Sequence, residues 1–433
     1  MVHPIGRSEE ILKRASGVIP GGVNSQNRVV PGGLVVREAH GAYLVEESGR
    51  RVLDYHAAFG PIVLGHADPG VNSAVAVALK TMDLAGVGIT ESEVELAEQL
   101  VARFPSAQKV LLTNSGSEAT YAAIRGARAA TGRTEIVKFQ GAYHGWHDAV
   151  ALNVISVAAR IGERDLLSDG MAPGVHGHTH VLAFNDVPGL EDFFAERGSQ
   201  VAAILVEIVQ HNVGCMLPSK EFLEAARRIG TEYGTVLIFD EVVTGIRHSL
   251  GGYQQMAGVT PDLTIIAKAL GNGYPIAALL GIDAIMERFA PGGGVFFAGT
   301  FNGHAAGVAA ALATIERLDD GSVHERTARL ARRLAEGLRD IARDKGIPMT
   351  VAQFGSVVTP YFYEGPVSTY TDLLANDNAL DVQFRRSMCN GGVFMIPAAL
   401  KRNHVSAAHT DDDITMTLEV AERVLGDLTR VHH

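Results

Sequence analysis

The residues of this 433-residue chain that are suited to chemistry lie directly after buried, strand-like runs. Lys268 follows the apolar run 263–267, and Asp240 ends the run 235–240. Buried lysines are rare, and burial lowers the pKa of the amine toward the neutral form that makes Schiff bases. A buried carboxylate needs a cationic partner, so Asp240 predicts a protonated ring nitrogen or an arginine beside it. Each residue also has a purely structural interpretation. Lys268 could reach the surface along its apolar stem, and Asp240 could belong to a structural salt bridge.

Two further segments supply a phosphate site and an aromatic ring. Residues 114–119 read Asn-Ser-Gly-Ser-Glu-Ala, a polar turn before an Ala-rich helix. The free N–H groups at a helix start bind phosphate, although the same turn also fits an ordinary N-capped helix. Tyr143 lies in the Gly-rich turn 141–145, where an aromatic ring either stacks on a flat heterocycle or simply packs. A phosphate cradle, an aromatic ring, a carboxylate and an amine are together what pyridoxal 5′-phosphate requires.

The elements that must position these residues alternate along the chain between about residues 90 and 310. Short buried strands are expected at residues 109–113, 135–139, 181–183, 202–207, 235–240, 263–267 and 277–281, and helices at residues 117–131, 220–233 and 303–318. Buried runs separated by helices are typical of an α/β fold with a mainly parallel, doubly wound sheet. Open sheets of this kind bind ligands at the carboxyl ends of their strands, where the four segments fall.

The two ends of the chain have a different pattern. We expect an antiparallel meander at residues 34–38, 43–46 and 52–54, a charged amphipathic helix at 323–345, a strand at 356–362 and a helix at 411–424 that Thr410 caps. The predicted organisation is a large domain, residues 61–315, and a small α+β domain. The small domain would combine the N-terminal segment 1–60 with residues 316–433.

Composition excludes several classes of protein. The chain has 47% hydrophobic residues, which is typical of a globular protein. Its 37 basic and 48 acidic residues give a net charge of −11, which argues against binding to nucleic acid or to an anionic membrane. No apolar run reaches the roughly 18 residues of a membrane-spanning helix, and residues 1–15 lack the apolar core of a signal peptide. Two cysteines, Cys215 and Cys389, are too few for a disulfide framework, so a cytoplasmic location is expected.

The chain resembles the class III aminotransferases, pyridoxal-phosphate enzymes of fold type I, over about residues 20–414. The closest branch is the one that contains glutamate-1-semialdehyde aminomutase. The matching segments are residues 20–25, 60–66, 114–119, 143–145, 239–245, Lys268, 298–300 and 408–410. The resemblance implies a large domain with a mainly parallel seven-stranded sheet between helices, a small domain made from both chain ends, and pyridoxal 5′-phosphate as cofactor.

The resemblance also implies a role for each matching site residue. Lys268 would form the Schiff base with the cofactor and carry the transferred proton, and Asp240 would hold the protonated ring nitrogen. Tyr143 and Val242 would cover the two ring faces. The phosphate would bind to Ser115, Gly116 and Ser117.

Three other roles follow from the same resemblance. Asn212 would lie near the phenolic oxygen of the cofactor. Thr300 would reach the phosphate of a neighbouring subunit, which implies a homodimer with shared active sites. Arg28 would bind a substrate carboxylate through its guanidinium fork, or alternatively lie on the surface without a role.

Several positions depart from the aminomutase pattern. Lys401 and Arg402 lie in a loop in which the aminomutase usually has an acidic residue. Phe59 occupies a position that is usually Trp, and Glu207 is followed by Ile208, where the family usually has Pro. A basic loop suggests an additional carboxylate contact. We therefore predict an aminotransferase that moves an amino group between an α- or β-amino acid and a keto acid or aldehyde in a ping-pong reaction. The alternatives are the aminomutase, a racemase or epimerase on the same cofactor, and a pyridoxal-phosphate-binding protein without turnover.

The remaining histidines give no positive prediction. His176, His178 and His180 alternate, so on a strand they would share a face as metal ligands do, but their Gly and Thr neighbours favour a loop. We interpret them as exposed histidines rather than as a metal site, and we interpret His144 and His147 in the same way. Cys215 is predicted to be a buried structural thiol.

Overall fold

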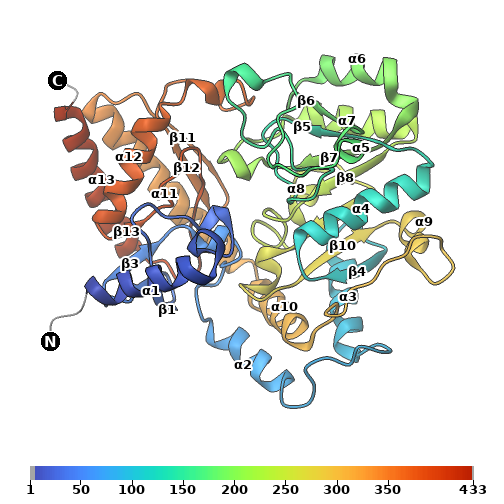
Figure 1. The fold of residues 1–433 in the computed structure, drawn as a ribbon, viewed down its shortest axis with the longest axis horizontal. Helices are drawn as coiled ribbons and strands as arrows, with labels where there is room; N and C mark the ends of the chain where they lie inside the picture. Colours follow the sequence, from blue (N-terminus) through green and yellow to red (C-terminus); the bar gives the residue numbers. More distant parts are fainter. Residues whose placement is uncertain (1–4, 432–433) are drawn as a thin grey trace.

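The computed structural model describes residues 5–431 of the chain. Figure 1 shows two parts: the large sheet with its helices on the right, and a smaller part on the left. The blue N-terminal elements and the red C-terminal helices lie together in the smaller part. We keep the limits 1–60, 61–315 and 316–433 as a proposal for the domain organisation.

The large sheet has seven strands in the order β4-β10-β9-β8-β7-β5-β6. Their bounds are β4 (Lys109–Thr113), β5 (Glu135–Phe139), β6 (Thr179–Leu182), β7 (Val201–Glu207), β8 (Val236–Asp240), β9 (Leu263–Ile266) and β10 (Ala277–Gly281). Only β10 runs antiparallel to its neighbours, β4 and β9. The other six strands therefore share one direction, and their carboxyl ends meet at one edge of the sheet. The mainly parallel sheet is confirmed, and each strand lies within two residues of its predicted position.

Helices cover both faces of this sheet because its strands are buried on both sides. On β8, Leu237 and Phe239 pack in a core cluster with Phe222 of α7, whereas Ile238 packs in the cluster that contains Ile124 of α4. The helices around the sheet are α2 (Pro69–Ala78), α3 (Glu91–Arg103), α4 (Gly116–Thr131), α5 (Pro173–His176), α6 (Val187–Arg197), α7 (Lys220–Tyr233), α8 (Gly252–Ala257), α9 (Asp283–Met286) and α10 (Ala305–Leu318).

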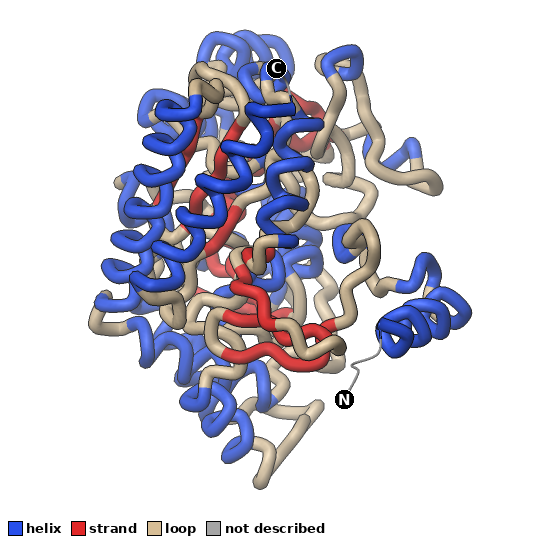
Figure 2. The backbone as a smooth tube through the Cα atoms, turned by 90° about the vertical axis from the view of Figure 1, so that its left-hand side faces the viewer, coloured by secondary structure: helices blue, strands red, loops and turns tan. Residues whose placement is uncertain are grey.

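Residues from both chain ends form the smaller part. A four-stranded sheet, β1-β2-β3-β13, contains the predicted meander, and β13 joins β3 in parallel. A second sheet has the order β11-β12-β14. The bounds are α1 (Ile5–Val18), β1 (Val36–His40), β2 (Tyr43–Glu46), β3 (Arg51–Asp54), α11 (Ser322–Lys345), β11 (Thr350–Phe354), β12 (Val357–Tyr361), α12 (Asn378–Asn390), β13 (Val393–Phe394), β14 (Asn403–His404) and α13 (Asp411–Val431). Figure 2 shows long helices on the outer side of these strands.

Two element boundaries differ from the sequence prediction for identifiable reasons. Helix α13 continues to Val431 instead of ending at residue 424, because Leu425 and Leu428 extend its buried stripe. Helix α10 begins at Ala305 instead of residue 303, because the His304 side chain accepts the Ala306 N–H as an N-cap. No helix within residues 5–431 is long and apolar enough to cross a membrane.

Candidate active site

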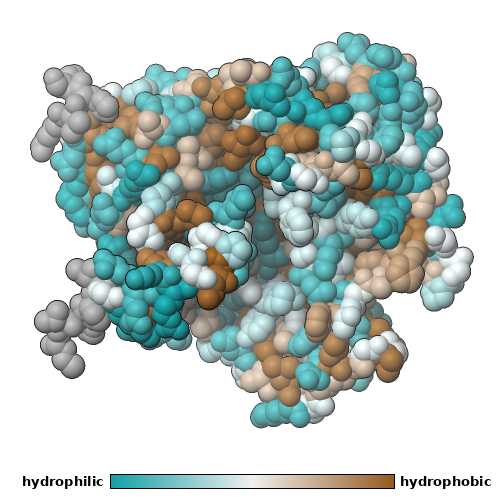
Figure 3. Space-filling model, in the orientation of Figure 1, coloured by the Kyte–Doolittle hydropathy of each residue, from teal (hydrophilic) through white to brown (hydrophobic). Residues whose placement is uncertain are grey.

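A cavity of about 580 Å³ lies where the carboxyl ends of the parallel strands face the smaller part of the molecule. The face shown in Figure 3 is hollowed between the two parts. The predicted site residues that line the cavity are Arg28, Ser115, Gly116, Ser117, Tyr143, Asn212, Asp240, Val242, Lys268, Lys401 and Arg402. Thr300 is exposed and lies outside this lining, so its contact with a neighbouring subunit stays a prediction.

Lys268 follows β9 and begins a short 3₁₀ turn that ends at Gly271. Its φ of +49° is in the left-handed region, which costs roughly 1–3 kcal/mol for a residue with a side chain and is typical of functional sites. Its amine has no hydrogen bond or ion pair to any residue of the described chain. Burial and, to a smaller extent, the charge of Arg402 lower the pKa of Lys268 to about 7, against the opposing effect of Asp240. About half of the amine is therefore neutral near pH 7.

Asp240 ends β8 and is held by two hydrogen bonds. Its Oδ1 accepts the N–H of Val242 at 3.0 Å, and its Oδ2 lies 2.7 Å from Nδ1 of His144. The sequence predicted a protonated ring nitrogen or an arginine beside Asp240. Within residues 5–431 the side-chain partner is His144 instead, and the protonated ring nitrogen stays a prediction for the bound cofactor.

The interpretation of His144 as an exposed histidine was wrong. The residue is buried in the turn after β5, where Gly145 brings the chain close to Ser117. Burial is the main cause that lowers the pKa of His144, the charge of Lys138 lowers it further, and Asp240 raises it. The neutral ring donates its Nδ1–H to the carboxylate, because an ionised carboxylate only accepts hydrogen bonds. Its Nε2 has no protein partner in the described structure.

The start of α4 forms the phosphate end of the cavity. Ser115 caps the helix: its Oγ accepts the N–H of Glu118 at 3.3 Å, and its own N–H donates to the Glu118 carboxylate at 3.0 Å. A Cβ added at Gly116 would lie 3.0 Å from Cγ2 of Val242, and one added at Gly145 would lie 2.5 Å from Oγ of Ser117. The turns after β4, β5 and β8 therefore meet at this helix start, whose N–H groups and dipole suit a phosphate.

Glu207 is a site residue that the sequence reasoning missed. It ends β7 and is buried, with Oε2 accepting the N–H of Tyr143 at 2.9 Å and Oε1 accepting that of Asn212 at 3.1 Å. Burial and the charge of Asp240 raise the pKa of Glu207 to about 7. The signal was present, because Glu207 ends an apolar strand in the same way as Asp240.

Lys401 and Arg402 enter the cavity on a loop of the smaller part. The Lys401 amine donates to the carbonyl of Asn212 at 3.1 Å, and burial lowers its pKa to about 7. Arg402 donates to the carbonyls of His211 at 2.8 Å and Phe59 at 3.0 Å.

The buried pair Asp381–Arg385 holds this loop. Asp381 accepts the N–H of Leu400 at 2.8 Å, and Arg385 donates to the carbonyl of Lys401 at 2.6 Å. Leu400 has a φ of +63° at this bend. The loop conformation that brings Lys401 to the cavity thus depends on a buried ion pair.

Arg28 also lines the cavity, from the N-terminal segment. It is exposed, and no hydrogen bond or ion pair holds its side chain within residues 5–431. The structure therefore places Arg28 where a substrate could contact it, and its role in binding the substrate carboxylate stays a prediction.

Arg247 is a second missed residue, and it supports a strained turn at the cavity wall. Ala57, Ala58 and Phe59 have consecutive positive φ values of 49°, 52° and 69°. The fully buried guanidinium of Arg247 donates to the carbonyl of Gly60 at 2.6 Å and to that of Ile62 at 2.8 Å. This region therefore presents Ala58 and Phe59 to the cavity in a fixed conformation.

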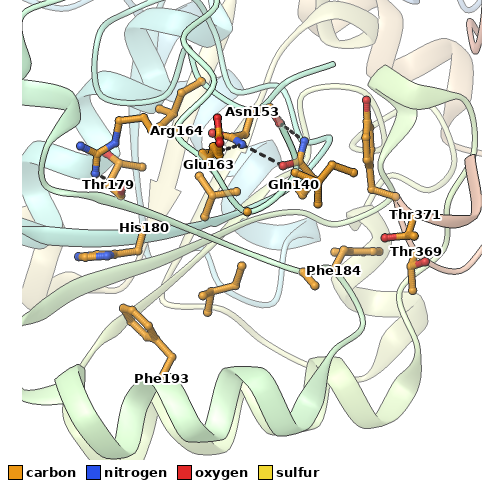
Figure 4. A pocket seen from close by; sticks show the side chains of 17 residues that line it. Gln140, Asn153, Glu163, Arg164, Thr179, His180, Phe184, Phe193, Thr369 and Thr371 are labelled. Carbon is orange, nitrogen blue, oxygen red and sulfur yellow. Dashed lines mark hydrogen bonds between the residues drawn. The ribbon is translucent and has the colours of Figure 1, made fainter. Parts of the chain in front are cut away.

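A second cavity of about 400 Å³ is lined by Gln140, Leu152 and Asn153, at the base of the loop that carries Tyr143 and His144. Figure 4 shows Gln140 and Asn153, bonded to each other, among its lining residues. None of the predicted site residues lines this cavity.

The three alternating histidines do not form a common face. His176 ends helix α5, whereas His180 lies in β6, 3.0 Å from the Glu135 carboxylate. Among residues 5–431, no group of three His, Cys, Asp or Glu side chains is placed to hold a metal ion.

The residues present fit pyridoxal phosphate. An unpartnered amine, a carboxylate backed by a buried histidine, an aromatic ring and an open helix start surround one cavity. The model of the class III aminotransferases matches residues 24–376. The chain belongs to the class III aminotransferase family. It is a pyridoxal-5′-phosphate enzyme, and a solved transaminase of similar fold contains the bound cofactor.

The similar proteins include an aminomutase and aminotransferases. A glutamate-1-semialdehyde 2,1-aminomutase of Rhodopirellula baltica is 41% identical, over 98% of this chain and 96% of the relative. An omega-transaminase structure from Sphaerobacter thermophilus has a TM-score of 0.93 and 31% identity, covering 99% and 98% of the two chains. A β-phenylalanine aminotransferase from Variovorax paradoxus has a TM-score of 0.87 and 27% identity, covering 98% and 95%.

Proposed function

We propose that this protein is an aminotransferase that moves an amino group between an α- or β-amino acid and a keto acid or aldehyde. The observation that carries the proposal is the set of basic side chains, Arg28, Lys401 and Arg402, that lines the cavity in addition to Lys268. Guanidinium and ammonium groups recognise carboxylates, and a transfer between an amino acid and a keto acid binds a carboxylate in each half. The omega-transaminase and the β-phenylalanine aminotransferase of similar fold support this assignment.

Each site residue has a defined task in this reaction. The cofactor supplies an aldehyde that binds amines and a ring that withdraws electrons from the substrate carbon. Lys268 holds the cofactor and then, as a neutral amine, moves the substrate proton. Asp240, fixed by His144, keeps the ring nitrogen protonated. Tyr143 contributes an aromatic side chain at the ring, and its position is set by Glu207.

The second candidate is the aminomutase, which the 41% identical relative supports. An internal transfer returns every amino group to the same carbon skeleton and releases no keto acid. A ping-pong transfer releases one keto acid for each cofactor that is converted to its amino form. The two candidates therefore differ in the product of a single half-reaction.

The test is to mix the holoenzyme with single α- and β-amino acids, without an acceptor, and to measure both the absorbance of the bound cofactor and the released keto acid. We expect one keto acid per active site with at least one donor. Arg402→Gln should raise the KM for that donor roughly tenfold or more, since a charge-assisted hydrogen bond is lost. Arg386→Gln, on the exposed side of α12, is the matched control. Fast turnover of glutamate-1-semialdehyde, with no donor producing keto acid, would overturn the assignment.

We also propose that the enzyme is a homodimer. Phe296 and Phe301 are 81% and 59% exposed on either side of Thr300, and Trp146, beside the phosphate end, is 76% exposed. Exposed aromatic side chains are typical of an interface. Sedimentation velocity should give twice the chain mass of 45.9 kDa, and a monomer that is fully active would contradict the proposal.

A further inference from the structure

Lys138 is a fully buried lysine that no step of the reaction uses. It lies in β5, whose side chains alternate between the two faces of the sheet. Val137 and Phe139 pack in the cluster of α6 and α7, whereas Ile136 packs on the opposite face, with α4. Lys138 therefore points to the α4 face. No carboxylate of the described residues lies within ion-pairing distance of its amine.

The Lys138 amine binds the two arms of one loop. It donates to the carbonyl of Ala142 at 3.0 Å and to that of Leu152 at 2.5 Å. At the base of the same loop, Nδ2 of Asn153 donates to Oε1 of Gln140 at 3.0 Å, and Nε2 of Gln140 donates to the carbonyl of Asn153 at 3.1 Å (Figure 4). The loop of residues 140–153 is thus closed at its base by the side-chain amides of Gln140 and Asn153 and, further along, by the amine of Lys138.

This loop carries two residues of the active site. Tyr143 follows Ala142 directly, and its N–H is bound to Glu207. His144 comes next, and its ring is bound to Asp240. A displacement of the Ala142 carbonyl therefore moves both side chains relative to the cofactor.

We propose that Lys138 is a positioning residue, which holds the Tyr143–His144 turn against Asp240 through the carbonyls of Ala142 and Leu152. An apolar side chain of the same length would fill the space but leave both buried carbonyls without a donor. Burial lowers the pKa of Lys138 to about 7, and the charge of Glu207 opposes this shift. In either protonation state the amine has at least two N–H donors for the two carbonyls. When protonated, it also adds to the lowering of the pKa of His144.

The first experiment compares Lys138→Met, Lys138→Gln and Lys138→Arg in the holoenzyme. Lys138 does not line the cavity, so we expect kcat to fall while KM stays nearly unchanged. A small misplacement of catalytic groups costs roughly 10- to 100-fold in rate, which is the loss expected for Lys138→Met. Lys138→Arg, which keeps the donors and the charge, should recover part of kcat. Lys109→Met, at an exposed ion pair on β4, should retain the activity of the wild type.

A double-mutant cycle separates positioning from a general loss of stability. If Lys138 acts through His144, Lys138→Gln should cost much less in a His144→Gln background than alone. Additive losses in kcat would overturn the proposal, as would a folded Lys138→Met enzyme with wild-type kcat. Where Lys138→Met does not fold, the cycle with Lys138→Gln decides.

These kinetic experiments depend on the proposed transamination, whereas a measurement of the cofactor absorbance does not. Lys138→Met and Lys138→Gln should shift the visible absorbance of the bound cofactor without any substrate, because the environment of Asp240 changes. An unshifted absorbance in both variants would contradict the proposal. A shift in an enzyme that accepts no amino donor would contradict the proposed function alone.

Discussion

The low pKa of Lys268 gives a quantitative prediction for cofactor capture. The pKa of the amine falls from 10.5 to about 7, mainly through burial and then through the charge of Arg402. At pH 7.5, an amine with a pKa of about 7 is roughly 75% neutral, whereas an ordinary lysine is about 0.1% neutral. From ionisation alone, Lys268 should therefore bind the cofactor aldehyde several hundred-fold faster than an ordinary lysine at this pH.

The perturbation is Arg402→Gln. Glutamine keeps an amide donor for the carbonyls of Phe59 and His211 but removes the positive charge that faces Lys268. Without that charge, Asp240 and Glu207 stabilise the ammonium form of Lys268 with less opposition, so its pKa rises. The neutral fraction at pH 7.5 then falls, and so does the rate of capture.

The assay mixes the apoenzyme with pyridoxal 5′-phosphate and follows the visible absorbance of the lysine-bound cofactor from about pH 6 to pH 10. In the wild type, the rate should rise with pH and level off just above pH 7, because the neutral amine is the reacting form. Arg402→Gln should move this inflection to higher pH, and Arg386→Gln should leave it in place. A wild-type rate that keeps rising to about pH 10 would refute the reasoning, as would an inflection that Arg402→Gln does not move.

Two further variants test the loops around the cavity. Asp381→Asn leaves the buried guanidinium of Arg385 without its carboxylate, which should cost about 3–5 kcal/mol of folding free energy. Calorimetry should show a lower melting temperature, and the released Lys401 loop should raise the KM for carboxylate substrates; an unchanged melting temperature would contradict this account. Gly145→Ala places a Cβ 2.5 Å from Oγ of Ser117 at a φ of +107°, so the apoenzyme should stay folded but bind the cofactor at least tenfold more weakly, or about 1.4 kcal/mol. Titration with cofactor measures this, and wild-type affinity would contradict the predicted closeness of the two turns.

The strands of the large sheet were predictable because they are buried on both faces. The run of residues 201–207 is apolar up to its last residue, which is how a strand between two helical layers must read. The edge strand β6 was placed two residues late, because the polar pair Thr179–His180 hides its start. The two-residue strands β13 and β14 were not predicted. They are too short for a periodic pattern and exist only through pairing with β3 and β12.

The cofactor-binding residues were predictable where an acidic or basic residue comes at the end of an apolar strand, as for Asp240 and Lys268. The residues that the sequence reasoning missed contact partners that are far away in the sequence. His144 becomes a site residue only because β5 and β8 end at the same edge of the sheet, which brings its ring to Asp240. Arg247 contacts Gly60, and the sequence separation of 187 residues gives no local pattern. The contacts of Thr300 and Arg28 with other molecules stay predictions.

The wall opposite the cofactor residues joins the two ends of the chain. The strained residues 57–59 cost roughly 1–3 kcal/mol each, so their conformation must be held by its surroundings. Arg402 binds the carbonyl of Phe59, and Arg247 binds that of Gly60, so two guanidinium groups hold the same turn. Arg402 therefore has two tasks, since it both lines the cavity and fixes Phe59. A substitution at Arg402 should for this reason also release the turn at Phe59. Its effect on KM should be strongly non-additive with that of Phe59→Gly, which removes the strain of the φ of 69°.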